Sequence, residues 1–181
     1  MTTAAKKSGG EDVIVKMFDY LDHAKKILME EGYLQPTVFA RTHYHDSLLV
    51  LPIVNDAGDL PDVAVELASK VIRAYNVSEY YVVSESYHVL ETEQLECINI
   101  IYVGLGDKKL ISTPLRRLDG GEFFFGETVE VIPSNVEGTI LDLFNLRELT
   151  PRLTDLEKQQ IRMLFPAQSD EEIAASNHTL H

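Results

Sequence analysis

The sequence predicts an α+β protein in which a mainly antiparallel sheet, formed by a hairpin and a four-stranded meander, has helices packed on one face. Residues 80–131 carry the first supporting observation, four β-rich apolar runs in succession with turn residues between them. Residues 37–54 hold two further β-rich runs, and segments with apolar residues at helical spacing lie on either side of them. Strand runs that follow one another through short turns favour antiparallel neighbours.

The composition fits a single globular domain and excludes several kinds of partner. Of the 181 residues, 45% are hydrophobic and 25% are charged, and the net charge is −13. A negative field repels phosphate groups, so we expect no direct nucleic-acid binding and no membrane binding. The one cysteine, Cys97, permits no disulfide within the chain, and no apolar run suits a secretion signal or a membrane span. We therefore expect a cytoplasmic protein.

Two amphipathic helices are expected upstream of the meander. The first covers residues 11–31 and ends at Gly32, a residue type that is common just after a helix. Its apolar residues recur every three or four positions: Ile14, Met17, Phe18, Leu21, Ala24, Ile27 and Leu28. The second begins at Pro61, which suits the first turn of a helix, and runs to residue 75.

Turn residues separate the expected strands. Residues 37–43 and 47–54 form the hairpin strands, and the polar loop at residues 55–59 leads into the second helix. In the meander, turns are expected at residues 91–94, 106–107 and 119–121, and the Asp-Gly pair in the last is the strongest signal. Both alternating faces of residues 80–89 and 97–103 are apolar, which favours central positions in the sheet for these strands.

The chain becomes helical again beyond the meander. Residues 138–146 suit a short helix, and Thr154 with Glu157 forms a capping box for a helix that Pro166 ends. We therefore divide the chain into a disordered N-terminus (residues 1–10), an α+β core domain (11–133), a helical C-terminal extension (134–166) and a flexible tail (167–181).

A candidate metal site lies near the tip of the expected hairpin, at His43, His45 and Asp46. In an extended chain, the two histidines point to the same face about 7 Å apart. Two imidazoles at that spacing can share one divalent metal ion, and a carboxylate can complete the ligand set. The alternative is that these are surface or structural histidines. No other cofactor is indicated by the sequence.

Glu85 and His88 are candidates for a cleft. Glu85 lies within an apolar strand, where a carboxylate must be hydrogen-bonded, have a raised pKa or face a cleft. The alternative is that this face of the strand is exposed to solvent. No Gly-x-Ser-x-Gly turn supports a serine-hydrolase triad built from the neighbouring serines and His88.

The run Phe123, Phe124 and Phe125 is a candidate interface. Side chains alternate along a strand, so these three rings cannot all point into one core. At least one ring must face a helix, a loop or another chain, and large exposed apolar groups are common at protein interfaces. We therefore expect a homo-oligomer or a protein partner.

The order of elements resembles that of a group of small bacterial and phage proteins with no assigned function. Those proteins combine helix, hairpin, helix and meander, with a Val-Ser-Glu-Ala-aromatic strand followed by an aliphatic strand. Residues 83–87, Val-Ser-Glu-Ser-Tyr, and residues 98–103 stand in those places, and the resemblance covers residues 13–131. This chain departs from the pattern in its histidine-bearing hairpin and its C-terminal extension. The resemblance implies the fold, and it allows a phage gene as the origin.

The leading functional hypothesis is a cytoplasmic protein-interaction or structural protein that self-associates. It follows from the acidic charge and the phenylalanine run. One alternative is a metal-dependent enzyme that uses the His-x-His site. A second alternative is an acidic mimic of nucleic acid that occupies a basic groove on another protein.

Overall fold

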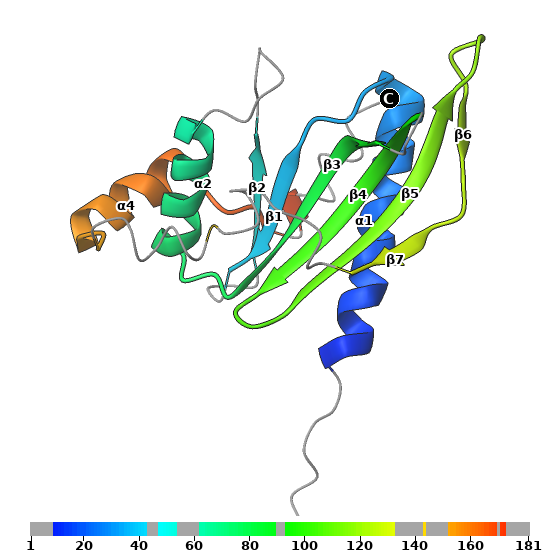
Figure 1. Ribbon diagram of the computed structural model, residues 1–181. Helices are drawn as coiled ribbons and strands as arrows, with labels where there is room; N and C mark the ends of the chain where they lie inside the picture. Colours follow the sequence, from blue (N-terminus) through cyan, green and yellow to red (C-terminus); the bar gives the residue numbers. More distant parts are fainter. Residues whose placement is uncertain are drawn as a thin grey trace, which may run out of the picture.

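A computed structural model describes residues 9–42, 47–53, 62–89, 93–132, 143, 152–169 and 171–172. These residues form three helices and a mainly antiparallel seven-stranded sheet, which confirms the predicted α+β class (Figure 1). The expected hairpin and meander are both present.

The sheet has the strand order β2-β1-β3-β4-β5-β6, and β7 pairs with β5 beside β6. Every neighbouring pair is antiparallel, and β1 joins the hairpin to the meander by pairing with β3. The strands are β1 (Thr37–Arg41), β2 (Leu48–Pro52), β3 (Glu79–Val89), β4 (Gln94–Gly104), β5 (Lys108–Arg117), β6 (Phe123–Phe125) and β7 (Val129–Val131).

The three helices are α1 (Gly9–Glu31), α2 (Asp62–Ala74) and α4 (Asp155–Leu164). Gly32 follows α1 with a φ of 80°, and its N–H donates to the carbonyl of Leu28 at 2.9 Å, as expected for a C-terminal glycine. The predicted capping box of Thr154 and Glu157 starts α4. Among the helices that the structure describes, none has the length and apolar character needed to cross a bilayer.

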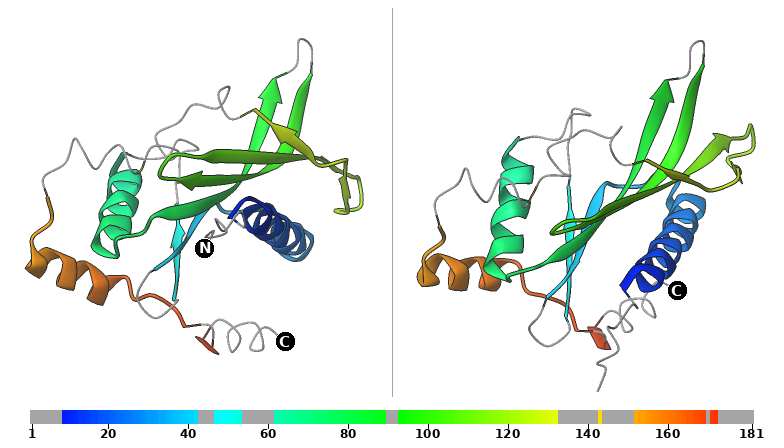
Figure 2. Two further views of the ribbon diagram at one scale, coloured as in Figure 1. Left: turned by 90° about the horizontal axis from the view of Figure 1, so that it is seen from below. Right: turned by 60° about the horizontal axis from the view of Figure 1, so that its bottom comes forward.

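The prediction that helices cover one face of the sheet is wrong, because α1 and α2 pack on opposite faces (Figure 2). On β3, Tyr81 and Val83 join the α1 core, whereas Tyr80 and Val82 join the α2 core. Successive strand residues point to opposite faces, so a strand that is apolar at every position needs cover on both. The α1 core consists of Val13, Met17, Leu21, Ala24, Leu28, Leu34, Tyr81, Val83, Ile98, Ile100, Tyr102, Ile111 and Leu115.

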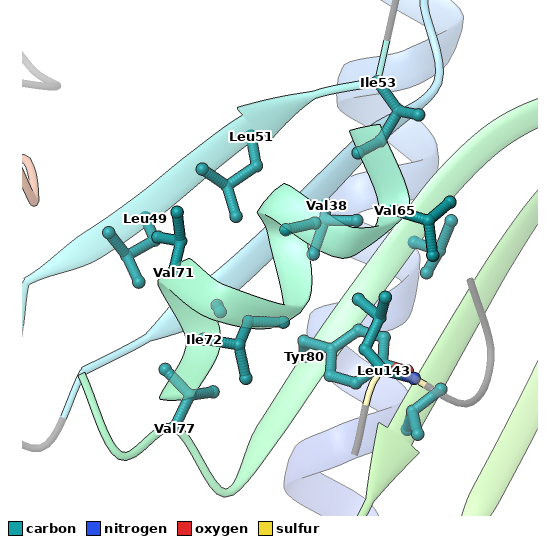
Figure 3. Packing of buried hydrophobic residues seen from close by; sticks show 14 of the residues in the cluster. Val38, Leu49, Leu51, Ile53, Val65, Val71, Ile72, Val77, Tyr80 and Leu143 are labelled. Atoms are coloured by element: carbon teal, nitrogen blue, oxygen red, sulfur yellow. The ribbon is translucent and has the colours of Figure 1, made fainter. Parts of the chain in front are cut away.

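The α2 core fills the other side of the sheet. Figure 3 shows α2 in front of the strands, with Val71 beside Leu49 of the hairpin and Ile72 beside Tyr80, while α1 lies behind. Leu143 is fully buried here, and its N–H donates to the Tyr80 hydroxyl at 3.3 Å. The rest of the short helix expected at residues 138–146 lies outside the described residues.

The fourth strand of the meander is divided into β6 and β7 by a bulge. The N–H of Gly126 donates to the carbonyl of Pro114 at 2.7 Å, and Ser112 pairs with Val129, so residues 127 and 128 together face Thr113. Pro114 explains the break. In an antiparallel ladder, the N–H and C=O of one residue face the same neighbouring strand. The Pro114 carbonyl faces Gly126, so the nitrogen of Pro114 faces it too, but it has no hydrogen to donate and the pair lacks its second hydrogen bond.

The C-terminal segment is attached to the α2 side of the core. The Tyr75 hydroxyl donates to the carbonyl of Phe165 at 2.8 Å, and Ile161 packs against the apolar cluster around α2. Leu48 at the edge of β2 exchanges two main-chain hydrogen bonds with Gln168, at 2.9 and 2.8 Å. The division at residue 134 into a core and an extension stays a prediction.

The two cores can be tested separately by truncating one buried side chain in each. Met17 of α1 is 0% exposed and Ile72 of α2 is 1% exposed. Each of Met17→Ala and Ile72→Ala is expected to lower the free energy of unfolding by about 2–5 kcal/mol in urea titrations. Val15→Ala, at a position 59% exposed on α1, is the control and should change it by less than about 0.5 kcal/mol. If Met17→Ala changed the free energy of unfolding no more than Val15→Ala does, the packing of α1 on the sheet would be contradicted.

Candidate functional site

The clearest constellation of charged groups is centred on Arg117 at the end of β5. Its Nη2 donates to Glu85 Oε2 of β3 at 2.7 Å, and its Nε donates to Glu96 Oε1 of β4 at 3.0 Å. The Glu85 and Glu96 side chains are 18% and 16% exposed, whereas the arginine is 40% exposed. A guanidinium presents its N–H groups in a planar fork, so one arginine can hold two carboxylates.

This arginine cluster, Glu85, Glu96 and Arg117, also fixes the end of α1. Arg117 Nη1 donates to the carbonyl of Gly32, and the N–H of Leu34 donates to Glu85 Oε1. Burial raises the pKa of Glu85, while the Leu34 amide and Arg117 act in the opposite direction. The cluster therefore ties the segment after α1 to β3, β4 and β5, and the cleft role expected for Glu85 stays a prediction.

The phenylalanine run alternates across β6 as its strand spacing requires. Phe123 and Phe125 stack with ring centroids 6.2 Å apart and pack against the α1 core. The Arg117 guanidinium lies 4.9 Å from the Phe123 ring centroid, and the Lys25 ammonium lies 5.6 Å from that of Phe125. Phe124 points to the opposite face and is 59% exposed. The run thus presents one large apolar ring to solvent at the periphery of the sheet.

Two further apolar side chains are exposed on α1. Phe18 and Met29 are 43% and 61% exposed, although helical spacing placed Phe18 with the buried residues. Both share a helix face with Lys25, because they lie seven and four positions from it. Since the Lys25 ammonium reaches Phe125, this face of α1 is turned toward β6.

A hollow of about 150 Å³ lies between α1 and β1. Tyr20 and Phe39 line it with stacked rings, 4.8 Å between centroids. Its other polar lining residues are His23, Glu31, Gln35 and Thr37. Burial raises the pKa of Tyr20 to about 12, so its phenol is neutral at physiological pH. Sequence reasoning missed this hollow, since nothing in the spacing along the chain brings α1 beside β1.

A row of small polar side chains crosses the other face of the sheet. Ser84, Asn99 and Ser112 lie directly opposite one another on β3, β4 and β5. Asn99 is 8% exposed and its Nδ2 donates to Ser86 Oγ, whereas its buried Oδ1 accepts no hydrogen bond from the part of the chain described. On this face, small polar side chains thus follow the apolar residues of β3 and β4 along the strands.

The candidate metal ligands His43, His45 and Asp46 lie outside the described residues, so the metal site stays a prediction. The backbone of His88 is in β3, but its side chain is likewise not described. Within the described ranges, no three histidine, cysteine or acidic residues come together in a way that could hold a metal ion.

No protein family, no curated protein and no solved structure matches this chain.

The arginine cluster predicts different effects for two adjacent arginines. Arg117→Ala leaves two largely buried carboxylates close together, and should lower the free energy of unfolding by about 2 kcal/mol. Arg116→Ala removes an exposed arginine on the opposite face, and should change it by less than about 0.5 kcal/mol.

Arg117→Ala should lower the free energy of unfolding by less at about pH 4 than at about pH 7, as measured by urea titration. In the folded variant, burial and the nearby Glu96 carboxylate raise the pKa of Glu85, and the Arg117 guanidinium no longer lowers it, so the folded state binds more protons than the unfolded state. The stability of the variant therefore falls as pH rises. An equal decrease in the free energy of unfolding for Arg117→Ala and Arg116→Ala would contradict the hydrogen bonds of Arg117 to Glu85 and Glu96.

Proposed function

We propose that this protein acts through protein–protein contact, and that it self-associates through strand β6 and the apolar surface beside it. One observation carries the proposal. Phe124 is 59% exposed on a terminal strand of the sheet, and Phe18 and Met29 are exposed on the face of α1 whose Lys25 reaches Phe125 of that strand. In soluble proteins, apolar groups gathered beside an unpaired strand edge are typical of contact surfaces.

The arrangement of β6 favours a rigid contact. The rings of Phe123 and Phe125 are held against the α1 core, with a cation beside each ring. A preordered aromatic surface loses little conformational entropy on binding, which favours association. Aromatic side chains and arginine are also enriched at the centres of protein interfaces.

Self-association is expected in sedimentation experiments on the untagged chain. The average mass should rise from that of one chain toward that of two as the concentration increases from about 5 to about 500 µM. Phe124→Ser should weaken the association at least about tenfold, since a buried aromatic anchor commonly contributes 2 kcal/mol or more. Leu105→Ser is the matched control, because Leu105 is 71% exposed in the turn between β4 and β5. A single-chain mass throughout this range would refute the proposal.

Ionic strength should distinguish self-association from binding to a basic partner. Two chains with a net charge of −13 each repel one another, and salt screens that repulsion. Self-association should therefore strengthen between about 20 and about 300 mM NaCl, as followed by sedimentation. Weaker association at high salt would indicate attraction between opposite charges and would argue against an apolar contact.

A further inference from the structure

The hydrogen-bond register of β6 identifies which of its main-chain groups face outward. Leu118 N–H donates to the Glu122 carbonyl at 2.9 Å, and Gly126 N–H donates to the Pro114 carbonyl at 2.7 Å. Hydrogen-bonded pairs alternate along an antiparallel ladder, so the bonded pair between these two is Arg116 with Phe124. The N–H and C=O groups of Phe123 and Phe125 consequently point away from β5.

This outer edge is open to another strand. In the described part of the chain, β6 ends the strand order, and Figure 1 shows it at the periphery of the sheet. The edge offers two donors and two acceptors, placed symmetrically about Phe124. Such a set is complementary to itself when a second copy runs in the opposite direction.

We propose that two copies of this chain pair through β6 in an antiparallel, two-fold arrangement centred on Phe124. This proposal rests on the self-association proposed above. In the pairing, Phe123 of each copy lies opposite Phe125 of the other. Each such pair exchanges two main-chain hydrogen bonds, so all four outward groups of both strands are satisfied. We take the occupant to be a second copy because the outward groups of Phe123 and Phe125 are complementary to the same groups of an antiparallel copy, and the exposed Phe124 ring would then meet its own equivalent.

The side chains fit the same arrangement. Phe124 of each copy lies at a non-hydrogen-bonded pair, where opposite side chains approach most closely, so the two exposed rings meet across the axis. The axis is perpendicular to the sheet, so the α1 helices of both copies lie on one face, and the exposed Phe18 and Met29 share the side of α1 from which Lys25 reaches Phe125. Apolar surface is thereby removed from water on both faces of the extended sheet.

The opposite edge of the sheet is less suited to such pairing. Leu48 of β2 already exchanges two main-chain hydrogen bonds with Gln168, so part of that edge is occupied by the C-terminal segment of the same chain. The β6 contact is short, and an association in the micromolar range or weaker is expected for so small an interface.

Amide exchange in the unmodified protein tests the pairing residue by residue. At concentrations where sedimentation shows dimers, the Phe123 and Phe125 amides should exchange about fivefold more slowly than in dilute samples. The Phe124 amide is bonded within one chain and should change less than about twofold, so it serves as an internal control. An equal change at Phe124, or no change at Phe123 and Phe125 in a dimeric sample, overturns the pairing and leaves self-association standing.

Cysteine cross-linking tests the direction of the strands while keeping all three phenylalanines. In the proposed register Glu122 faces Gly126 of the second copy, so a mixture of Glu122→Cys and Gly126→Cys chains should form a disulfide. Glu122→Cys alone should not, because its two copies lie about 14 Å apart. The unsubstituted chain, whose Cys97 is buried, is the control.

The outcomes separate the two proposals. Cross-linking of Glu122→Cys with itself would indicate parallel strands and overturn the pairing, as would a mixture that dimerises without cross-linking. A chain that sediments as a monomer at every concentration removes both the pairing and the self-association. If either cysteine variant unfolds, as judged by circular dichroism, the exchange experiment on the unmodified chain still decides the question.

Discussion

The fold depends on the burial of β3 and β4 from both sides. Alternate residues of β3 enter different cores, Tyr80 and Val82 on one face and Tyr81 and Val83 on the other. Leaving either pair in water would forgo about 1.5–3 kcal/mol for each large side chain. A single layer of helices cannot satisfy such a strand, so α1 and α2 must both be present, and the hairpin extends the sheet beneath α2. The strands therefore determine where the helices lie.

The chemistry of the sheet changes where the helices end. Beyond Glu31 no helix covers β3 and β4 on the α1 face in the described part of the chain, and charged side chains replace apolar ones. Half-buried carboxylates must find partners there, and Arg117 supplies one guanidinium for both Glu85 and Glu96. On the opposite face, Ser84 and Asn99 occupy the corresponding positions with small polar groups. On the α1 face, the ion pairs of Arg117 thus compensate for the cover that α1 no longer provides.

Local patterns predicted the elements more completely than their assembly. Helical spacing, the glycine after α1 and the capping box each depend on neighbouring residues, and all three are present in the structure. The turn expected at residues 119–121 is also present, but its positive φ lies at Gly121 rather than in the Asp-Gly pair. The apolar residues at both parities of β3 implied two buried faces, but the prediction of helices on one face did not follow that implication. The pairing of Glu85 with Arg117 could not be predicted, since it spans 32 positions and depends on the register of three strands. The division of the last strand depends on Pro114, whose missing N–H matters only once the neighbouring strand is known.

The same proline determines what kind of assembly the β6 edge can form. By ending regular pairing at Gly126, it limits β6 to three residues and turns the following strand out of register. A long, straight apolar edge would invite pairing in many registers and at any length, whereas a short edge permits few. A two-fold contact through β6 uses that edge on both copies, and Gln168 occupies part of the edge that remains at β2. In the proposed two-fold contact, the β6 edge of each copy is used once, so pairing through β6 would stop at two chains.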